Sequence, residues 1–208
     1  MLVDQYEYLM NNILGARTVF DVGAKDGRDT AQFLRIFPFA DIYAFDCSES
    51  CVEKLTLAFK SESRVTVIPK AVSDYSGIEI FYSCSMKGSS GLFPVSSEFS
   101  IEAKNTGSCE VESITLDDFI EEQGISHVDL LKIDIEGADL LALQGCEQTI
   151  SKGIVRAVLC ELLFYPYYEG QHGACEIMGF MDDHGFSLHA MWPQYWGGRL
   201  RYANALFL

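Results

Sequence analysis

Basic residues are scarce in this chain of 208 residues. Fifteen Lys and Arg stand against 30 Asp and Glu, which leaves a formal net charge of −15. Such a charge repels the phosphates of nucleic acids and anionic membrane surfaces, so we expect neither as a partner. Most of these carboxylates are interpreted as solvent-facing groups that keep an apolar-rich protein soluble. The charge therefore excludes partners and leaves the function open.

Paired cysteines and long apolar runs are also missing. The seven cysteines include no Cys-x-x-Cys pair and no zinc-ligand spacing with histidine, which argues for structural thiols in a reducing compartment. No uncharged apolar stretch approaches the roughly 18 residues that span a bilayer, and the first residues lack the pattern of a secretory signal. We expect a soluble cytoplasmic protein.

The composition is that of a globular protein, with 49% hydrophobic and 22% charged residues. The length fits one domain, and we predict a single domain over residues 1–208. Leu2, Tyr6, Leu9 and Ile13 recur at helical spacing and predict an N-terminal helix within residues 1–15. The oligomeric state stays open.

Strands alternate with helices along most of the chain. Short apolar runs predict strands at 18–22, 41–45, 65–68, 128–134 and 157–161. Helical spacing predicts helices at 30–37, 48–60, 116–123, 138–150 and 175–184. This rhythm indicates βαβ units, and therefore an α/β fold with a doubly wound, mainly parallel sheet covered by helices on both faces.

Residues 78–112 interrupt this rhythm. Residues 78–82 alternate like an exposed antiparallel strand, whereas residues 83–108 are rich in Ser, Gly and Lys and show little periodicity. Long irregular segments in compact domains are often lids or binding loops. We interpret residues 78–112 as an insertion that forms a lid over the active site, with a flexible surface loop as the alternative.

The C-terminal segment predicts a hairpin. Only residues 193–201, with Gly197-Gly198 among them, separate apolar strands at 186–192 and 202–208. A parallel pair would need a crossover of about a dozen residues or more, so these strands should be antiparallel. A seven-stranded, Rossmann-like sheet closed by an antiparallel C-terminal hairpin is associated with S-adenosylmethionine-dependent methyltransferases and differs from nicotinamide-binding domains.

A glycine loop, Val22-Gly23-Ala24-Lys25-Asp26-Gly27, follows the first predicted strand. Its spacing departs from the dinucleotide pattern Gly-x-Gly-x-x-Gly, and Asp26 would repel a pyrophosphate at the helix start. Asp21 and Asp26 can instead face the cationic aminoacyl end of S-adenosylmethionine, and Lys25 its carboxylate. A tight turn that packs the helix on the sheet is the alternative. The predicted cofactor-binding residues of this segment are Asp21, Gly23, Ala24, Lys25, Asp26, Gly27 and Thr30.

Asp46 ends the second predicted strand, where a carboxylate can accept hydrogen bonds from both hydroxyls of a ribose. This supports an adenosine nucleoside, and a helix-capping role is the alternative. We also predict cofactor contacts from Cys47 and, after the third strand, from Ala71 and Val72, whose backbone could bind an adenine edge.

The most informative segment is Leu131–Ala138. Lys132, Asp134 and Glu136 alternate with apolar residues, so they point to one side at the end of a central strand. Charges in such a place are costly unless they are paired or used. A buried Lys132–Asp134 pair that holds the sheet end together is the alternative.

These segments together resemble the FkbM family of methyltransferases. The resemblance rests on Asp21-Val22-Gly23-Ala24, Phe45-Asp46, Ala71-Val72-Ser73-Asp74, Leu116-Asp117-Asp118-Phe119, and Leu131 to Ala138 with Gly145 following. It implies an S-adenosylmethionine-dependent O-methyltransferase that acts on a hydroxyl of a sugar, glycan or natural product. Lys25 stands where the family usually has Asn, and Lys70 also departs from its pattern.

An alkyl hydroxyl is too weak an acid to lose its proton unaided, so we expect a base or a metal at the site. Asp134 and Glu161 end adjacent predicted strands and are the candidate seat for Mg²⁺, although they could bind the cofactor or the acceptor directly. Glu136 or His189 is the candidate base. The predicted catalytic residues are therefore Asp134, Glu136, Glu161 and His189.

Aromatic residues gather at the predicted ligand edge, in Phe164–Tyr168 and in Trp192–Trp196. Their rings can stack on a sugar or an apolar acceptor, or they can pack under the lid. We therefore expect an O-methyltransferase for a small-molecule or saccharide acceptor. The alternatives are a nicotinamide-dependent oxidoreductase and a catalytically silent adenosylmethionine-binding module that acts through a partner.

Overall fold

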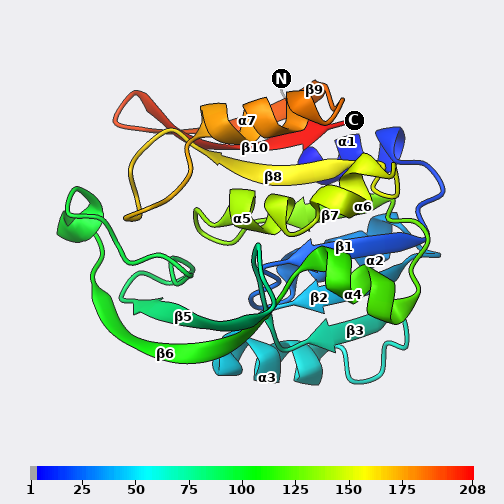
Figure 1. Cartoon of the computed structure of the whole chain (residues 1–208), viewed down its shortest axis with the longest axis horizontal. Helices are drawn as coiled ribbons and strands as arrows, with labels where there is room; N and C mark the ends of the chain where they lie inside the picture. Colours follow the sequence, from blue (N-terminus) through cyan, green and yellow to red (C-terminus); the bar gives the residue numbers. More distant parts are fainter. Residues whose placement is uncertain (1–3) are drawn as a thin grey trace.

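The protein is built on a seven-stranded sheet with the order β3-β2-β1-β7-β8-β10-β9, as seen in a computed structural model that describes residues 4–208 (Figure 1). Strands β3 to β8 of this order run parallel, and β10 is antiparallel to both of its neighbours, β8 and β9. The strands are β1 (Thr18–Val22), β2 (Asp41–Phe45), β3 (Val65–Ile68), β7 (Leu130–Ile133), β8 (Val158–Leu163), β9 (Leu188–Trp196) and β10 (Arg199–Phe207). The predicted fold, with its antiparallel C-terminal hairpin, is confirmed.

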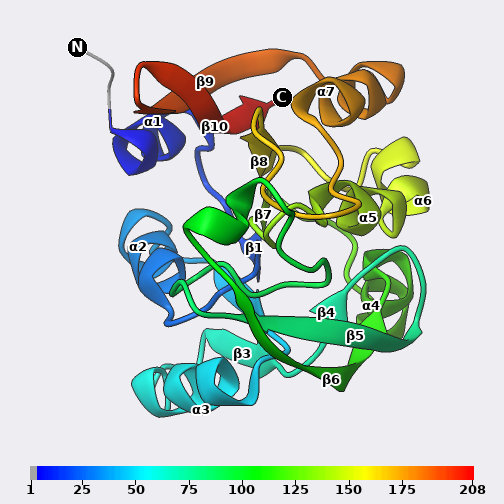
Figure 2. The same cartoon turned by 90° about the vertical axis from the view of Figure 1, so that its left-hand side faces the viewer.

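Helices cover both faces of this sheet (Figure 2). One face carries α1 (Gln5–Asn12), α2 (Arg28–Ile36) and α3 (Glu49–Ala58), and the other carries α4 (Leu116–Gln123), α5 (Asp139–Gln144), α6 (Glu147–Ser151) and α7 (Ala174–Asp183). Two apolar cores result, one around Phe33 and one around Phe20. The first three residues of the predicted N-terminal helix lie outside the described part of the chain.

The single helix predicted at 138–150 is two helices, α5 and α6. The chain passes so close to another segment at Gly145 that a Cβ there would lie 2.1 Å from the carbonyl oxygen of Ser73. Asp117 then caps α6 by accepting the backbone N–H groups of Gln148 and Thr149, at 3.0 and 2.8 Å. The break arises from these tertiary contacts, which helical periodicity does not report.

A second, three-stranded sheet consists of β4 (Ala71–Val72), which precedes the predicted insertion, and of β5 (Gly77–Cys84) and β6 (Asn105–Ile114), which make up most of its two ends. A short 3₁₀ helix, η1 (Phe99–Ile101), lies between β5 and β6. The strand predicted at 78–82 is present, but β6 was not predicted. Residues 105–110 are exposed, so this half of β6 lacks the alternation of a half-buried strand. In Figure 2 the η1 segment lies in front of the central strands.

No helix within residues 4–208 is both long and apolar enough to cross a membrane.

Candidate functional site

A cavity of about 1120 Å³ lies where the loops that follow β1, β2, β7 and β8 meet the insertion and the β9–β10 hairpin. Its volume exceeds the roughly 300–1,000 Å³ of single small-molecule sites, so it has room for two ligands. The residues that line it include Gly23, Ala24, Lys25, Asp26, Asp46, Cys47, Lys70, Ala71, Val72, Cys84, Lys87, Ser90, Gly91, Phe99, Glu102, Asp134, Glu136, Glu161, Tyr167, Tyr168, Tyr195, Trp196, Arg201, Tyr202 and Asn204.

A buried ion network lies beneath the glycine loop. The Lys132 ammonium is 3.0 Å from Asp21 Oδ1 and 3.3 Å from Asp29 Oδ2, and Thr30 Oγ1 donates to Asp21 Oδ2 at 2.6 Å. The Tyr6 hydroxyl, on α1, donates to Asp29. Burial raises the pKa of Asp21 and lowers that of Lys132, but the carboxylates outweigh burial and hold the pKa of Lys132 above its usual range. Asp21 and Thr30, which were predicted to contact the cofactor, do not line the cavity. They instead hold the glycine loop from below, because Asp21 forms an ion pair with Lys132 and accepts the hydrogen bond of Thr30.

Gly23 lets two loops meet. Its φ is +81°, and a Cβ there would lie 2.0 Å from the carbonyl oxygen of Asp134, so glycine is required. The amides of Gly23 and Ala24 both donate to the carbonyl of Phe45, at 3.0 and 2.9 Å. Gly27, also predicted to contact the cofactor, instead packs against α3, where a Cβ would lie 2.6 Å from the Phe59 ring. It does not line the cavity.

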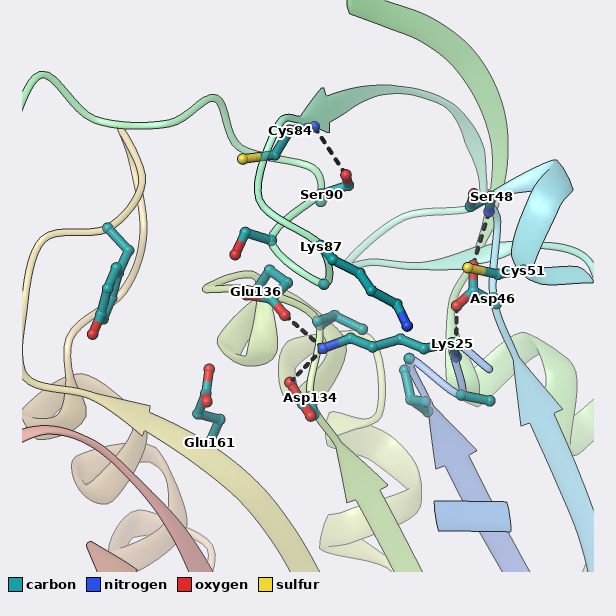
Figure 3. Close-up of a pocket in the computed structure, with 18 of the residues that line it drawn as sticks. Lys25, Asp46, Ser48, Cys51, Cys84, Lys87, Ser90, Asp134, Glu136 and Glu161 are labelled. Carbon is teal, nitrogen blue, oxygen red and sulfur yellow. Dashed lines mark hydrogen bonds and ion pairs between the residues drawn. The ribbon is translucent and has the colours of Figure 1, made fainter. Parts of the chain in front are cut away.

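The Asp46 carboxylate is held in place by the backbone. Its Oδ2 accepts the amide of Lys25 and its Oδ1 accepts the amide of Ser48, both at 2.9 Å (Figure 3). Each oxygen retains a further lone pair, so the group can still accept hydrogen bonds from a ligand. Burial raises the pKa of Asp46, and these backbone bonds oppose that effect. The carboxylate therefore forms a fixed acceptor on the cavity wall.

Glu136 joins two sides of the cavity. Its Oε1 lies 2.6 Å from the Lys25 ammonium, and its Oε2 accepts the Tyr168 hydroxyl at 2.5 Å. Lys25 also lies 3.6 Å from Asp134, and Figure 3 shows its ammonium between the two carboxylates. Lys25 and Glu136 both have positive φ, +52° and +58°, which non-glycine residues seldom adopt. Glu136, one of the two candidate bases predicted from sequence, therefore bridges Lys25 and Tyr168, with both of its oxygens engaged.

Glu161 has a free carboxyl. Within residues 4–208 that group makes no hydrogen bond or ion pair, and Figure 3 shows it directed into the cavity beside Asp134. Burial, together with the charges of Asp134 and Glu136, raises its pKa well above the usual range. An unpaired carboxyl with a raised pKa, open to a cavity, is suited to accept a proton.

Asp139 was missed by the sequence reasoning. It is 1% exposed; its Oδ1 accepts the amide of Glu161 at 3.2 Å, and its Oδ2 accepts the amide of Ile135 at 3.4 Å. Burial raises its pKa to about 7, and the charge of Asp134 adds to this. Asp139 therefore ties the loop of Asp134 to the strand of Glu161. The sequence signal that could have identified Asp139 is an acidic residue at the start of the otherwise apolar helix α5.

Two predicted features are not found at the cavity. His189 is exposed on β9, where its ring lies 6.1 Å edge-on from Tyr8 of α1, so it is not placed to act as a base. The predicted Mg²⁺ seat at Asp134 and Glu161 is not supported, since no group of three or more His, Cys, Asp or Glu among the described residues is arranged to hold a metal. The Lys25 ammonium lies beside Asp134 instead.

The insertion closes over the Lys25–Glu136 pair. Gly91 packs against Glu136, so that a Cβ on Gly91 would lie 3.1 Å from the Cβ of Glu136. Lys87 reaches to 3.9 Å from Asp26 on the glycine loop, and Ser90 Oγ accepts the amide of Cys84 at 2.9 Å. Residues 84–91 therefore cover the center of the cavity (Figure 3).

Five of the seven aromatic residues predicted at this edge fall into two groups. Tyr167, Tyr168, Tyr195 and Trp196 line the cavity, and Phe99 of η1 packs edge-on against Tyr167 at 4.8 Å. Trp192 instead packs against Tyr8 of α1, at 5.5 Å. We refer to the part of the cavity that is lined by the first group as the aromatic end.

Known proteins resemble this chain in sequence. Residues 21–188 match the family described as methyltransferase FkbM domain. The 2-O-methyltransferase NoeI of Sinorhizobium fredii is 25% identical over 186 residues, which cover 85% of this chain and 74% of NoeI. The methyltransferase sdnD of Sordaria araneosa is 27% identical over 207 residues, which cover 87% of this chain and 78% of sdnD.

Solved structures share the fold. The FkbM methyltransferase from Methylobacillus flagellatus aligns with a TM-score of 0.57 at 13% identity, over 93% of this chain and 43% of that protein. The magnesium protoporphyrin IX methyltransferase from Synechocystis, solved with S-adenosylmethionine, aligns with a TM-score of 0.53 at 13% identity, over 97% of this chain and 75% of that one. The family match spans most of the sequence, including the cavity loops. This chain belongs to the FkbM family of S-adenosylmethionine-dependent methyltransferases.

Proposed function

We propose that this methyltransferase transfers a methyl group to a hydroxyl oxygen of a saccharide or similar natural-product acceptor. The observation that carries the proposal is the free carboxyl of Glu161 inside a cavity large enough for two ligands. An oxygen acceptor must lose a proton, and Glu161 is an unpaired group suited to take it. The relative NoeI, named as a 2-O-methyltransferase, supports the same reaction class.

We propose that the cofactor lies along the wall of Asp46. The carboxylate of Asp46 would accept hydrogen bonds from the ribose hydroxyls, while Cys47, Ala71 and Val72 would contact the adenine. Lys25 and Asp134 offer a cation and an anion to the aminoacyl end, which carries one charge of each sign. When bound, S-adenosylmethionine supplies a methyl group on a positively charged sulfur. The donor set of this wall fits that group.

The chain's own residues would then align the acceptor, exclude water and move one proton. Glu161 would accept the proton that the acceptor hydroxyl loses, and Asp139 would hold its backbone in position. Glu136 would stay a bridge between Lys25 and Tyr168. Residues 78–112, as the lid of a single domain, would keep water from the reacting groups.

Thermal unfolding with ligands tests the cofactor class. A ligand present at about 100 times its dissociation constant adds about 2.7 kcal/mol, which should raise the Tm of a chain this size by roughly 5–10 °C. We expect this shift with S-adenosylhomocysteine and none with NADH. A shift with NADH alone would refute the proposed function, and binding without methyl transfer to a broad panel of hydroxyl acceptors would favour a silent binding module.

Asp46→Ala is expected to weaken the binding of S-adenosylhomocysteine by at least about 100-fold, because two hydrogen bonds to a charged acceptor contribute roughly 1.5–3 kcal/mol each. Isothermal titration calorimetry measures the change. Asp41→Ala is the matched control, since Asp41 is an exposed acid at the opposite end of the same strand. Equal affinities for the wild type and Asp46→Ala would remove Asp46 from the cofactor site.

A further inference from the structure

A β-bulge places Arg201 at the aromatic end of the cavity. β10 pairs with β9 at Leu200↔Tyr195 and Tyr202↔Gln194, so Arg201 is the extra residue at a register shift. Successive side chains of a regular strand point to opposite faces, yet both Arg201 and Tyr202 line the cavity. Bulges redirect side chains in this way and occur often beside active sites. Because of the bulge in β10, the Arg201 side chain lines the cavity together with that of Tyr202; in a regular strand the two would point to opposite faces.

Arg201 is oriented but has no acidic partner. Its guanidinium carbon lies 3.6 Å from the center of the Tyr165 ring, a cation–π contact that holds the group in one place. No carboxylate within residues 4–208 lies within 4.0 Å of it, and its Nε is buried without a hydrogen-bond partner. Of the other lysines and arginines that line the cavity, Lys25, Arg28, Lys70 and Lys87 each have a carboxylate within 4.0 Å. Lys54, an exposed residue of α3, has none among residues 4–208, but it lies away from the aromatic end, on the helix that follows Asp46. Arg201 thus retains its capacity to bind an anion.

Arg201 lies close enough to Glu161 for one acceptor molecule to contact both residues. Asn204 pairs directly with Glu161 across β8 and β10, and Arg201 lies three residues from Asn204 along β10. At about 3.3 Å per residue the backbones of Arg201 and Asn204 are separated by roughly 10 Å, and the side chains of Arg201 and Glu161 both line the cavity. One or two sugar rings fit this span. An acceptor with its hydroxyl at Glu161 can therefore reach Arg201 with another group.

The hairpin tip adds a surface for rings. Tyr195 and Trp196 are 64% and 70% exposed and line the cavity next to the Gly197-Gly198 turn. The hairpin, the η1 segment and the loop after β8 all lie on the side of the molecule that faces the viewer in Figure 2. Exposed aromatic faces favour sugar rings. The aromatic end therefore combines ring surfaces with a guanidinium that has no carboxylate within 4.0 Å among residues 4–208.

We propose that Arg201 binds a carboxylate on the acceptor, so that the acceptor is an acidic saccharide. This rests on the proposed function of the same cavity. The planar guanidinium offers two parallel N–H donors that match the two oxygens of a carboxylate. A hydroxyl of a neutral sugar can accept one of these N–H groups, but it supplies neither the negative charge nor the second parallel acceptor of a carboxylate.

Matched sugar pairs test this assignment. We would measure the binding of methyl glucoside, galactoside and mannoside, and of the corresponding uronic acids, to the protein with and without S-adenosylhomocysteine, by ligand-observed NMR. At least one uronic acid should bind about tenfold more tightly than its neutral partner, and the preference should weaken at about 0.5 M salt. If no uronic acid is preferred, the proposal is wrong.

Variants of Arg201 test whether this residue causes the preference for the uronic acid. Arg201→Met should reduce it to about twofold or less, and Arg201→Lys should retain part of it because the charge remains without the planar fork. Arg199→Met is the matched control, since Arg199 is exposed on the same strand and does not line the cavity. A preference that survives Arg201→Met would overturn the assignment. Failure of the proposed function is separate: the preferred acid would bind but accept no methyl group from S-adenosylmethionine.

Discussion

Glu161→Gln is expected to lower turnover by about 100-fold or more while leaving the affinity for S-adenosylhomocysteine within a few-fold of wild type. General-base catalysis contributes about 10²–10⁴ to rates, and glutamine keeps the shape of the side chain but cannot accept the proton. The carboxyl has no hydrogen bond or ion pair to lose among residues 4–208, so the fold should be little disturbed. The assay follows S-adenosylhomocysteine formation with a competent acceptor.

The dependence of kcat on pH distinguishes a role of Glu161 as a proton acceptor from a role as a negative charge alone. A base must be ionised, and burial raises the pKa of Glu161 well above its usual range. Wild-type kcat should therefore rise with pH through this raised pKa, and the remaining activity of Glu161→Gln should lack that rise. Glu102→Gln removes an exposed acid that also lines the cavity and serves as the control for charge. Turnover within threefold of wild type in Glu161→Gln would exclude Glu161 as the base.

Lys132→Met is expected to reduce the free energy of unfolding by about 3–5 kcal/mol, because it leaves the carboxylate of a buried acid without its cation. Lys132 and Asp21 have side chains that are only 5% and 0% exposed, and their charged groups lie 3.0 Å apart. For a chain of this length the loss should lower Tm by roughly 10 °C. Urea unfolding measures the free energy directly.

Two comparisons make this test specific. Lys152→Met makes the same change at an exposed lysine and should alter stability by less than about 0.5 kcal/mol. Asp21→Asn combined with Lys132→Met should recover part of the loss, since the uncompensated charge is then removed. If Lys132→Met is as stable as Lys152→Met, the ion network does not support the glycine loop.

Much of the fold was predictable because it depends on local patterns. Apolar runs located β1, β2 and β3 to the residue, and the short connection within 193–201 required an antiparallel hairpin. β6 was missed because its first residues are exposed on both faces, so no period of two marks them. The break between α5 and α6 depends on the contact of Gly145 with Ser73, which lies far away in sequence.

The residues of the candidate site were predictable from their positions near the carboxyl ends of parallel strands. Asp46 and Asp134 directly follow the parallel strands β2 and β7, and Glu161 lies within β8, two residues before its end; the topology brings all three to one cavity. Their partners were not predictable, because pairing depends on side-chain reach. Lys25 engages Glu136 across 111 residues of sequence, and this contact leaves Glu161, rather than Glu136, as the free carboxyl.

The bridge formed by Glu136 has a consequence for the order in which two substrates bind. One oxygen of Glu136 holds Lys25 beside the cofactor wall, and the other holds Tyr168 at the aromatic end. A ligand that draws Lys25 away leaves Glu136 attached to Tyr168 alone, so occupancy on one side alters the contacts on the other. Thermodynamic linkage makes such an effect reciprocal. Cofactor and acceptor should therefore bind with a shared coupling energy rather than as independent ligands.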